Sequence, residues 1–132
     1  CAMHIRRNSA LQVHNSVFTG WPYGLFLDKA NSAAAVKNVV FAGMWKEAKD
    51  DASASYFLTA GLGNSSFAST NDVIKTNGLY SSVDAAKVAG ASFTDAAISD
   101  SFFTKVNYKG AFDGTNDWTA GWANWDPQNT DY

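Results

Sequence analysis

Three tryptophans near the C-terminus have a spacing that could form a sugar-binding surface. Trp118, Trp122 and Trp125 are separated by four and three residues, so on a helix they would share one face. Exposed, their rings could stack on sugar rings, and Trp21 and Tyr23 beside an early turn offer a second pair. Buried, the same tryptophans would pack in a core or plug the end of a repeat structure. We expect burial, because large aromatic side chains dominate buried area.

A second group of side chains carries oxygen atoms that could bind calcium. Asp113, Asn116 and Asp117 lie within five residues, and Asp126 follows nearby. Carboxylate and amide oxygens are the ligands that Ca²⁺ prefers, but this spacing does not match the EF-hand loop. We favour a tight polar turn, with a calcium site as the alternative.

Motifs for catalysis or cofactor binding are weak. The two histidines, His4 and His14, have no Cys/His cluster beside them, so a zinc site is not indicated. The chain has no Gly-x-Ser-x-Gly elbow, and Gly61-Leu62-Gly63 lacks the third glycine of a dinucleotide-binding loop. Asp50-Asp51 lies in a charged run, which indicates a solvated face rather than a glycosidase pair. The sequence therefore predicts no catalytic residue and no cofactor.

The elements that would position these residues include a strand-like segment that occurs twice. Residues 13–20 read Val-His-Asn-Ser-Val-Phe-Thr-Gly, and residues 36–43, at an offset of 23, read Val-Lys-Asn-Val-Val-Phe-Ala-Gly. A short strand that recurs every roughly 20–50 residues is typical of a solenoid, in which each coil buries its apolar face against the next. We predict that the two segments pair in parallel and in register, with Asn15 above Asn38.

Asn15 and Asn38 are the asparagines that the repeat retains. We expect their amides to form an internal ladder, each bonding the backbone of the next coil, because buried amides need hydrogen-bond partners. Ligand binding is the alternative for this pair. A third asparagine would fall at position 61, which is Gly61, so we expect the repeat to stop after Trp45.

Phenylalanines occur one residue away from the apolar positions of the repeat. Phe18 follows Val17 and Phe41 follows Val40, and Phe26 stands in the same relation to its leucine neighbours. In a regular strand adjacent residues point to opposite faces. We therefore expect the three rings on an outer face that the C-terminal segment or another chain covers. A bulge that turns both residues inward is the alternative.

We predict a single domain in three parts. Residues 1–45 form solenoid coils, residues 46–100 an elaborated loop with short helices, and residues 101–132 an aromatic capping tail. The charged residues 46–51 indicate a helical turn or loop. Further short helices are expected near 70–74, capped by Thr70 or Asn71, and over 82–90.

Both ends of the chain resemble a known group. Residues 15–28, preceded by 5–9, resemble the late coils of right-handed parallel β-helix proteins. Residues 102–112, followed by 117–122 and 126–129, are similar to the C-terminal closing segment of large secreted or surface proteins of Bacteroidetes-type bacteria. The resemblance implies a mainly β chain at the end of a right-handed parallel β-helix, secreted or at the cell surface. It carries over no activity, because the catalytic groups of related β-helix enzymes lie on earlier coils.

Composition limits the classes of function. The 132 residues are 46% hydrophobic and 17% charged, enough for one folded domain with a modest core. A net charge of −2 argues against nucleic acid as a partner. No apolar run approaches the ~18 residues of a membrane span.

Three functions fit these observations. The leading hypothesis is a non-catalytic structural module, formed by the last coils and cap of a secreted bacterial β-helix protein. The alternatives are a carbohydrate-binding module that binds polysaccharide through its tryptophans, and a fragment of a polysaccharide-degrading enzyme whose catalytic coils lie upstream. The strand pattern begins at the first residues, so the N-terminal coil would present unpaired backbone groups. We therefore expect a homo-oligomer joined through residues 3–28.

Overall fold

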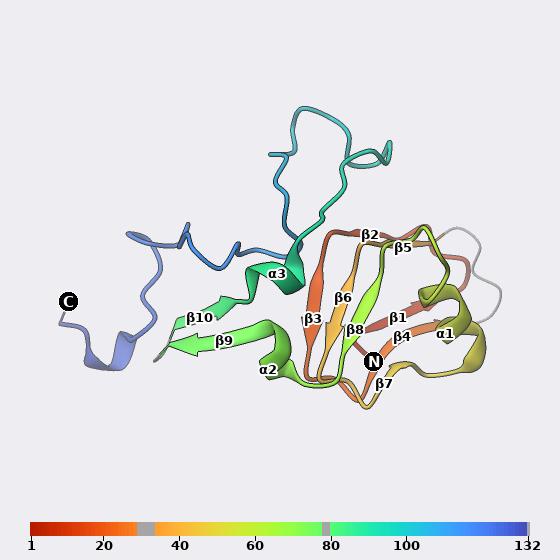
Figure 1. Cartoon of the computed structure of the whole chain (residues 1–132), viewed down its shortest axis with the longest axis horizontal. Coiled ribbons are helices and arrows are strands. Elements are labelled where there is room, and N and C mark those ends of the chain that lie inside the picture. Colours follow the sequence, from red (N-terminus) through yellow and green to blue (C-terminus); the bar gives the residue numbers. More distant parts are fainter. Residues whose placement is uncertain (29–33, 78–79, 132) are drawn as a thin grey trace.

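Eight short strands form three parallel sheets in a computed structural model of the chain, which describes residues 1–28, 34–77 and 80–131 (Figure 1). Successive strands among these eight belong to different sheets, so neighbouring strands of one sheet are 22 to 25 residues apart. The prediction of a mainly β chain is confirmed. The first sheet contains β1 (Met3–Arg6), β4 (Tyr23–Asp28) and β7 (Lys46–Ala48), the second β2 (Gln12–His14) and β5 (Ala35–Lys37), and the third β3 (Val17–Thr19), β6 (Val40–Ala42) and β8 (Ser65–Phe67).

The repeat sets the register of the second and third sheets, as predicted. β2 pairs with β5 in parallel with Val13 opposite Val36, and β3 pairs with β6 with Phe18 opposite Phe41. The sharp corners between these strands are made by Asn15 and Asn38, whose φ angles are 47° and 54°. Asparagine tolerates this left-handed conformation better than most residues.

The repeat continues beyond the predicted boundary at residue 45. β7 pairs with β4, and β8 pairs with β6, both in parallel. The expectation that the repeat stops after Trp45 is therefore wrong. The helix between β7 and β8 lengthens this turn of the chain to 25 residues, so Gly63, with φ 69°, takes the corner position that we sought at Gly61.

The three sheets enclose an inner cluster of apolar side chains. Its buried members include Leu25 from the first sheet, Val36 from the second and Phe41 from the third. The Phe41 ring is fully buried and stacks on Phe57 at a centroid distance of 4.5 Å. Among the described residues, its buried members are Met3, Ile5, Leu25, Ala34, Val36, Val39, Phe41, Ala48 and Phe57.

An outer cluster lies on the opposite face of the third sheet. Its fully buried residues are Val40 and Ala42 from β6, together with Val73 and Val88 from the segment that follows β8. Val17, Phe67, Ile74, Val83 and Tyr108 pack against them. The expectation that an outer face is covered is confirmed for the third sheet, where the cover is the chain's own segment 69–110.

The assignment of side chains to the two faces of the third sheet was wrong. Phe18 and Phe41 point inward and contact each other edge to face, whereas Val17 and Val40 point outward. The larger rings fill the space between the three sheets, and the smaller valines fit beneath short helices. Phe26 does lie on the outer side of the first sheet, where His4 stacks on its ring at 4.7 Å.

Short helices close the ends and faces of the sheets. α1 (Asp51–Phe57) begins where Asp50 accepts a hydrogen bond from the Ser53 backbone, and hydrogen bonds from Ser53 lower the pKa of Asp50. α2 (Thr70–Val73) is confirmed at the predicted place, but Ser69 caps it with a capping box. α3 (Ala85–Val88) lies within the predicted segment 82–90, after the antiparallel hairpin of β9 (Ile74–Asn77) and β10 (Tyr80–Val83).

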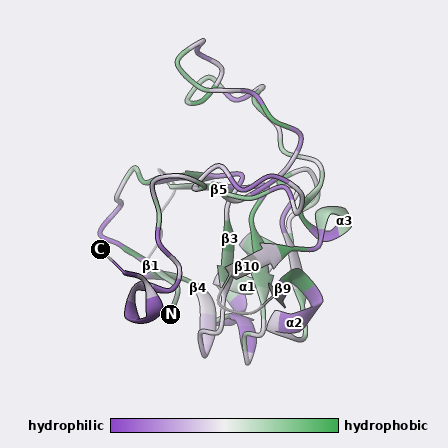
Figure 2. Cartoon of the chain, turned by 90° about the vertical axis from the view of Figure 1, so that its left-hand side faces the viewer, coloured by the Kyte–Doolittle hydropathy of each residue, from purple (hydrophilic) through white to green (hydrophobic). Residues whose placement is uncertain are grey.

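Two irregular segments leave the body of the molecule. Residues 90–107 form a loop that projects above the second sheet, and Ala89 and Tyr108 close its base in an antiparallel bridge (Figures 1 and 2). The tail after Gly110 runs past the β9–β10 hairpin, away from the parallel sheets, and includes a short 3₁₀ helix, η1 (Pro127–Asn129). None of the described helices has the length and hydrophobicity that a membrane span requires.

Candidate functional site

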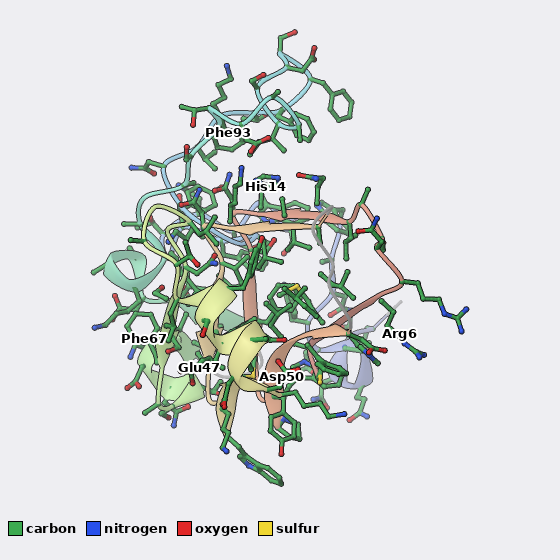
Figure 3. The ribbon with its side chains drawn as sticks, turned by 90° about the vertical axis from the view of Figure 1, so that its right-hand side faces the viewer. Arg6, His14, Glu47, Asp50, Phe67 and Phe93 are labelled. Carbon is green, nitrogen blue, oxygen red and sulfur yellow. The ribbon has the colours of Figure 1, made fainter. Side chains whose placement is uncertain are left out.

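A polar cleft of about 580 Å³ lies between the second sheet and the base of the projecting loop. Its floor is formed by the outward side chains of β2 and β5, and its walls by two loops. The lining residues are His14, Lys37, Asn38, Ala60, Gly61, Leu62, Ser92, Thr94 and Asp95. Figure 3 shows His14 pointing from the sheet toward the loop that carries Phe93.

The alternation of the strands places His14 and Lys37 side by side on the cleft floor. Val36 points into the inner cluster and Val13 packs against it, so their neighbours on the strands face outward. His14 lies directly opposite Lys37 in the parallel register. Its Nε2 is 3.2 Å from Oε1 of Gln12 on the same face. The repeat thus brings together two chemically different side chains from equivalent positions.

An ion pair fastens the projecting loop to this floor. The Lys37 ammonium donates to Asp95 Oδ2 at 2.5 Å, and the Ala97 backbone N–H donates to Asp95 Oδ1 at 3.0 Å. The hydrogen bond from Lys37 is the main reason that the pKa of Asp95 is lowered, and the same bond raises the pKa of Lys37. Both groups therefore stay charged near neutral pH, and their charges cancel.

His14 contributes a neutral ring to the cleft. Burial lowers the pKa of His14 and outweighs the opposite effect of the Asp95 carboxylate. A neutral imidazole has one donor and one acceptor nitrogen. The cleft therefore offers donors and acceptors with no excess of charge among its lining side chains.

The corner beneath the cleft differs from the predicted asparagine ladder. The Asn15 amide donates from Nδ2 to the Ser92 carbonyl at 2.8 Å, and the Ser92 N–H donates back to Asn15 Oδ1 at 3.0 Å. Asn15 therefore bonds the projecting loop instead of the next turn of the parallel strands. It lies at the edge of the stack, where the loop's backbone is the nearest partner, whereas Asn38 packs its Oδ1 against Gly63.

Lys109 closes the same corner from the other end of the loop. It is buried, its ammonium donates to the Gly63 carbonyl at 3.0 Å, and burial lowers its pKa. The neighbouring Gly110 N–H donates to the Asn15 carbonyl at 2.7 Å. Both ends of the loop 90–107 are therefore tied to the corners of the parallel strands.

The C-terminal tryptophans are exposed, contrary to the expected burial. Trp118 is 56% exposed and Trp122 is 68% exposed, with ring centroids 5.3 Å apart, and Trp125 is 42% exposed. Their indole N–H groups bond within the tail: Trp122 donates to the Trp118 carbonyl and Trp125 to the Thr119 hydroxyl. The tail folds on itself, and the outer cluster is already covered by α2 and α3, so these rings do not plug the sheets.

The other aromatic and acidic candidates lie apart from the cleft. Trp21 is 50% exposed at a corner before β4, whereas Tyr23 is half-buried. Asp113 accepts hydrogen bonds from the backbone of Thr115 and Asn116 and from the Asn116 side chain. These bonds lower the pKa of Asp113 to about 2, and they form a tight polar turn.

Asp117 bonds Thr119 in the next turn of the tail. Within the described ranges, no group of three or more His, Cys, Asp or Glu side chains gathers where it could hold a metal ion. The oxygens of Asp113 that we considered as calcium ligands are used by the turn itself.

Sequence reasoning missed Lys37, Asp95 and Asn64. Asn64 accepts from the Val39 N–H and donates to the Val36 carbonyl, which satisfies the backbone where β5 turns into β6. Asn64 directly follows the corner glycine, so an alignment of Gly63 with Asn38 would have singled it out. Lys37 aligns with His14 in the repeat, but nothing in the sequence links either residue to Asp95.

Comparison of the chain with protein-family models, with curated proteins and with solved structures finds no match. Function is therefore inferred from the geometry of this chain.

Proposed function

We propose that the chain is a structural module, the C-terminal coils and cover of a right-handed parallel β-helix from a secreted bacterial surface protein. The in-register pairing of strands in three sheets supports a solenoid architecture. The observation that carries the structural role is the outer cluster, in which segment 69–110 covers the fully buried Val40 and the half-buried Val17. A sheet face that would otherwise be apolar and exposed is covered by the same chain, as expected of a closing segment.

The structural role is tested by opening this cover. Val88→Asp places a charge in the outer cluster, where Val88 is fully buried, and Ala86→Asp places the same charge on the exposed side of α3. We expect the first variant to bind a hydrophobic dye and to self-associate in light scattering, and the second to resemble the unmodified chain. If Val88→Asp changes neither readout, segment 69–110 is not needed to cover the sheet.

A carbohydrate-binding module is the second candidate, and the exposure of the tail tryptophans favours it. Phe112, Trp118 and Trp122 form a run of ring contacts, with centroid separations of 5.9 Å and 5.3 Å. Titration of soluble polysaccharides while tryptophan fluorescence is recorded tests this role. A response that disappears in Trp122→Ala supports it, and no response across a broad panel contradicts it. The third hypothesis, a fragment of a polysaccharide-degrading enzyme, gains no support from the described residues.

The proposal also includes a homo-oligomer joined through the strands of residues 3–28. β1, β2 and β3 each stand at an edge of their sheets. Phe18 does not add to this surface, because its ring points into the inner cluster. Light scattering at micromolar concentration decides between an oligomer and a monomer.

A further inference from the structure

We propose that the cleft between the second sheet and the projecting loop binds a neutral saccharide. The ligand would lie over β2 and β5, between His14 and Lys37 on the floor and Ser92, Thr94 and Asp95 on the loop. This site is separate from the tail tryptophans and from every residue that the sequence singled out as a sugar ligand. A sugar could bind there whether or not the chain closes a longer solenoid.

The volume and lining of the cleft suit a small polar ligand. Its volume of about 580 Å³ lies within the range of roughly 300–1,000 Å³ that is usual for small-molecule sites. The lining comes from three parts of the chain: the strands of the floor, residues 60–62 and residues 92–95. The ion pair and the paired hydrogen bonds of Asn15 tie residues 92–95 to the strands, and the Asn38 N–H donates to the Leu62 carbonyl at 2.7 Å. The cleft is therefore built by bonded contacts and does not depend on a single loop.

The Lys37–Asp95 ion pair favours a ligand without net charge. An anion would be drawn to a lone ammonium, but Asp95 lies 2.5 Å from Lys37 Nζ and offsets its charge. A cation would be drawn to a lone carboxylate, but the Lys37 ammonium offsets the charge of Asp95. A neutral ligand with adjacent hydroxyl groups matches the pair better, because one hydroxyl can accept from the ammonium while its neighbour donates to the carboxylate.

The remaining polar groups extend the same pattern. Ser92 and Thr94 join their hydroxyls at 3.0 Å, and each hydroxyl retains further capacity to donate or accept. His14 adds a neutral ring from the floor. Hydroxyl-rich ligands need such a mixture of donors and acceptors, because each ligand hydroxyl that loses water on binding must regain a partner.

Filling the cleft from position 60 tests the proposal without removing any of these bonds, whereas filling it from position 94 removes only the contact between the Ser92 and Thr94 hydroxyls. Ala60 is exposed and lines the cleft, so Ala60→Trp would occupy it. Leu58→Trp adds a ring at an exposed site in the same region that does not line the cleft. Thr94→Trp fills the cleft from the opposite wall, so the test survives if one variant fails to fold. Circular dichroism and thermal melting establish folding for each.

The probes are cellobiose, maltose, mannobiose and xylobiose at millimolar concentration, with inorganic phosphate as an anionic control. Ligand-observed saturation-transfer NMR detects binding, and calorimetry measures affinity. We expect at least one disaccharide to bind, with binding lost in Ala60→Trp and Thr94→Trp and retained in Leu58→Trp. Lys37→Met and Asp95→Asn should each weaken it about tenfold or more, since each removes a hydrogen bond to a charged group.

Several results would overturn the proposal. These are no binding of any disaccharide, binding of phosphate alone, or binding that persists in both filled variants. Sugar binding that is lost in Trp122→Ala and unchanged in Ala60→Trp would assign it to the tail instead. The dye-binding test of Val88→Asp is independent of all these outcomes, so the structural role and the sugar site can fail separately.

Discussion

The two faces of the third sheet are both buried, but by different means. The inner cluster is formed mainly by strands that repeat along the sequence, with Phe18 opposite Phe41 on neighbouring strands. The outer cluster joins repeated strands to the segment 69–110, which has no counterpart in the repeat. The inner face therefore depends on the register of the strands, whereas the outer face depends on how one later segment is tied down.

The largest expected effect lies in the inner cluster. Phe41→Ala should lower the free energy of unfolding by about 3–5 kcal/mol, because the ring is fully buried and stacks on Phe57. Phe18→Ala should cost less, since Phe18 is half-buried at the edge of the same sheet. Chemical denaturation measures both. Equal losses would mean that the stack on Phe57 adds nothing to the stability of the inner cluster.

A matched pair of valines compares the two clusters directly. Val36 and Val88 are both fully buried, the first in the inner cluster and the second in the outer one. Each change to alanine should cost about 1.5–3 kcal/mol. Only Val88→Ala should also speed proteolytic cleavage within loop 90–107. If Val36→Ala speeds this cleavage equally, the two clusters open together and the distinction fails.

The corner at Gly63 lies between α1 and β8 and can be tested with an internal control. A β-carbon on Gly63 would overlap Asn38 Oδ1, whereas one on Gly61 would meet no atom of the described residues within 4 Å. Both residues have positive φ, so alanine at either should cost roughly 1–2 kcal/mol for the left-handed backbone. Gly63→Ala should cost more than Gly61→Ala, and thermal melting compares them. Equal costs would show that Asn38 moves aside freely.

The smallest expected effect is a pH dependence that is confined to segment 69–110. The folded-state pKa of Asp95 is lowered, so its ion pair with Lys37 stabilises the loop above the unfolded carboxyl pKa of about 3.9. That contribution is lost as the pH falls through the folded-state pKa of Asp95, which is the lower of the two. The NMR amide signal of Ser92 should report the release, while signals from β6 stay unchanged. In Asp95→Asn the acid-induced shift of Ser92 should disappear, and its persistence would assign it to another group.

The sequence was informative where residues repeat. The offset of 23 residues predicted the parallel register, and the helical segments at 70–74 and 82–90 were recognised because their local signals are strong. The same reasoning failed after Trp45, because α1 adds two residues to one turn of the chain and shifts the corner from 61 to 63. A fixed offset cannot anticipate an insertion, and β7 contains a lysine and a glutamate that do not resemble a strand.

For the repeated segments 13–20 and 36–43, residue type and a constant offset were enough to predict parallel strands and their register. Tertiary packing sets which face Phe41 occupies, which group bonds Asn15 and the contact between Lys37 and Asp95. Side-chain alternation fixes two opposite faces but not which of them is the interior, and that choice depends on the volume available between packed sheets. The cleft joins residues 58 positions apart in the chain, and no local pattern records such a contact.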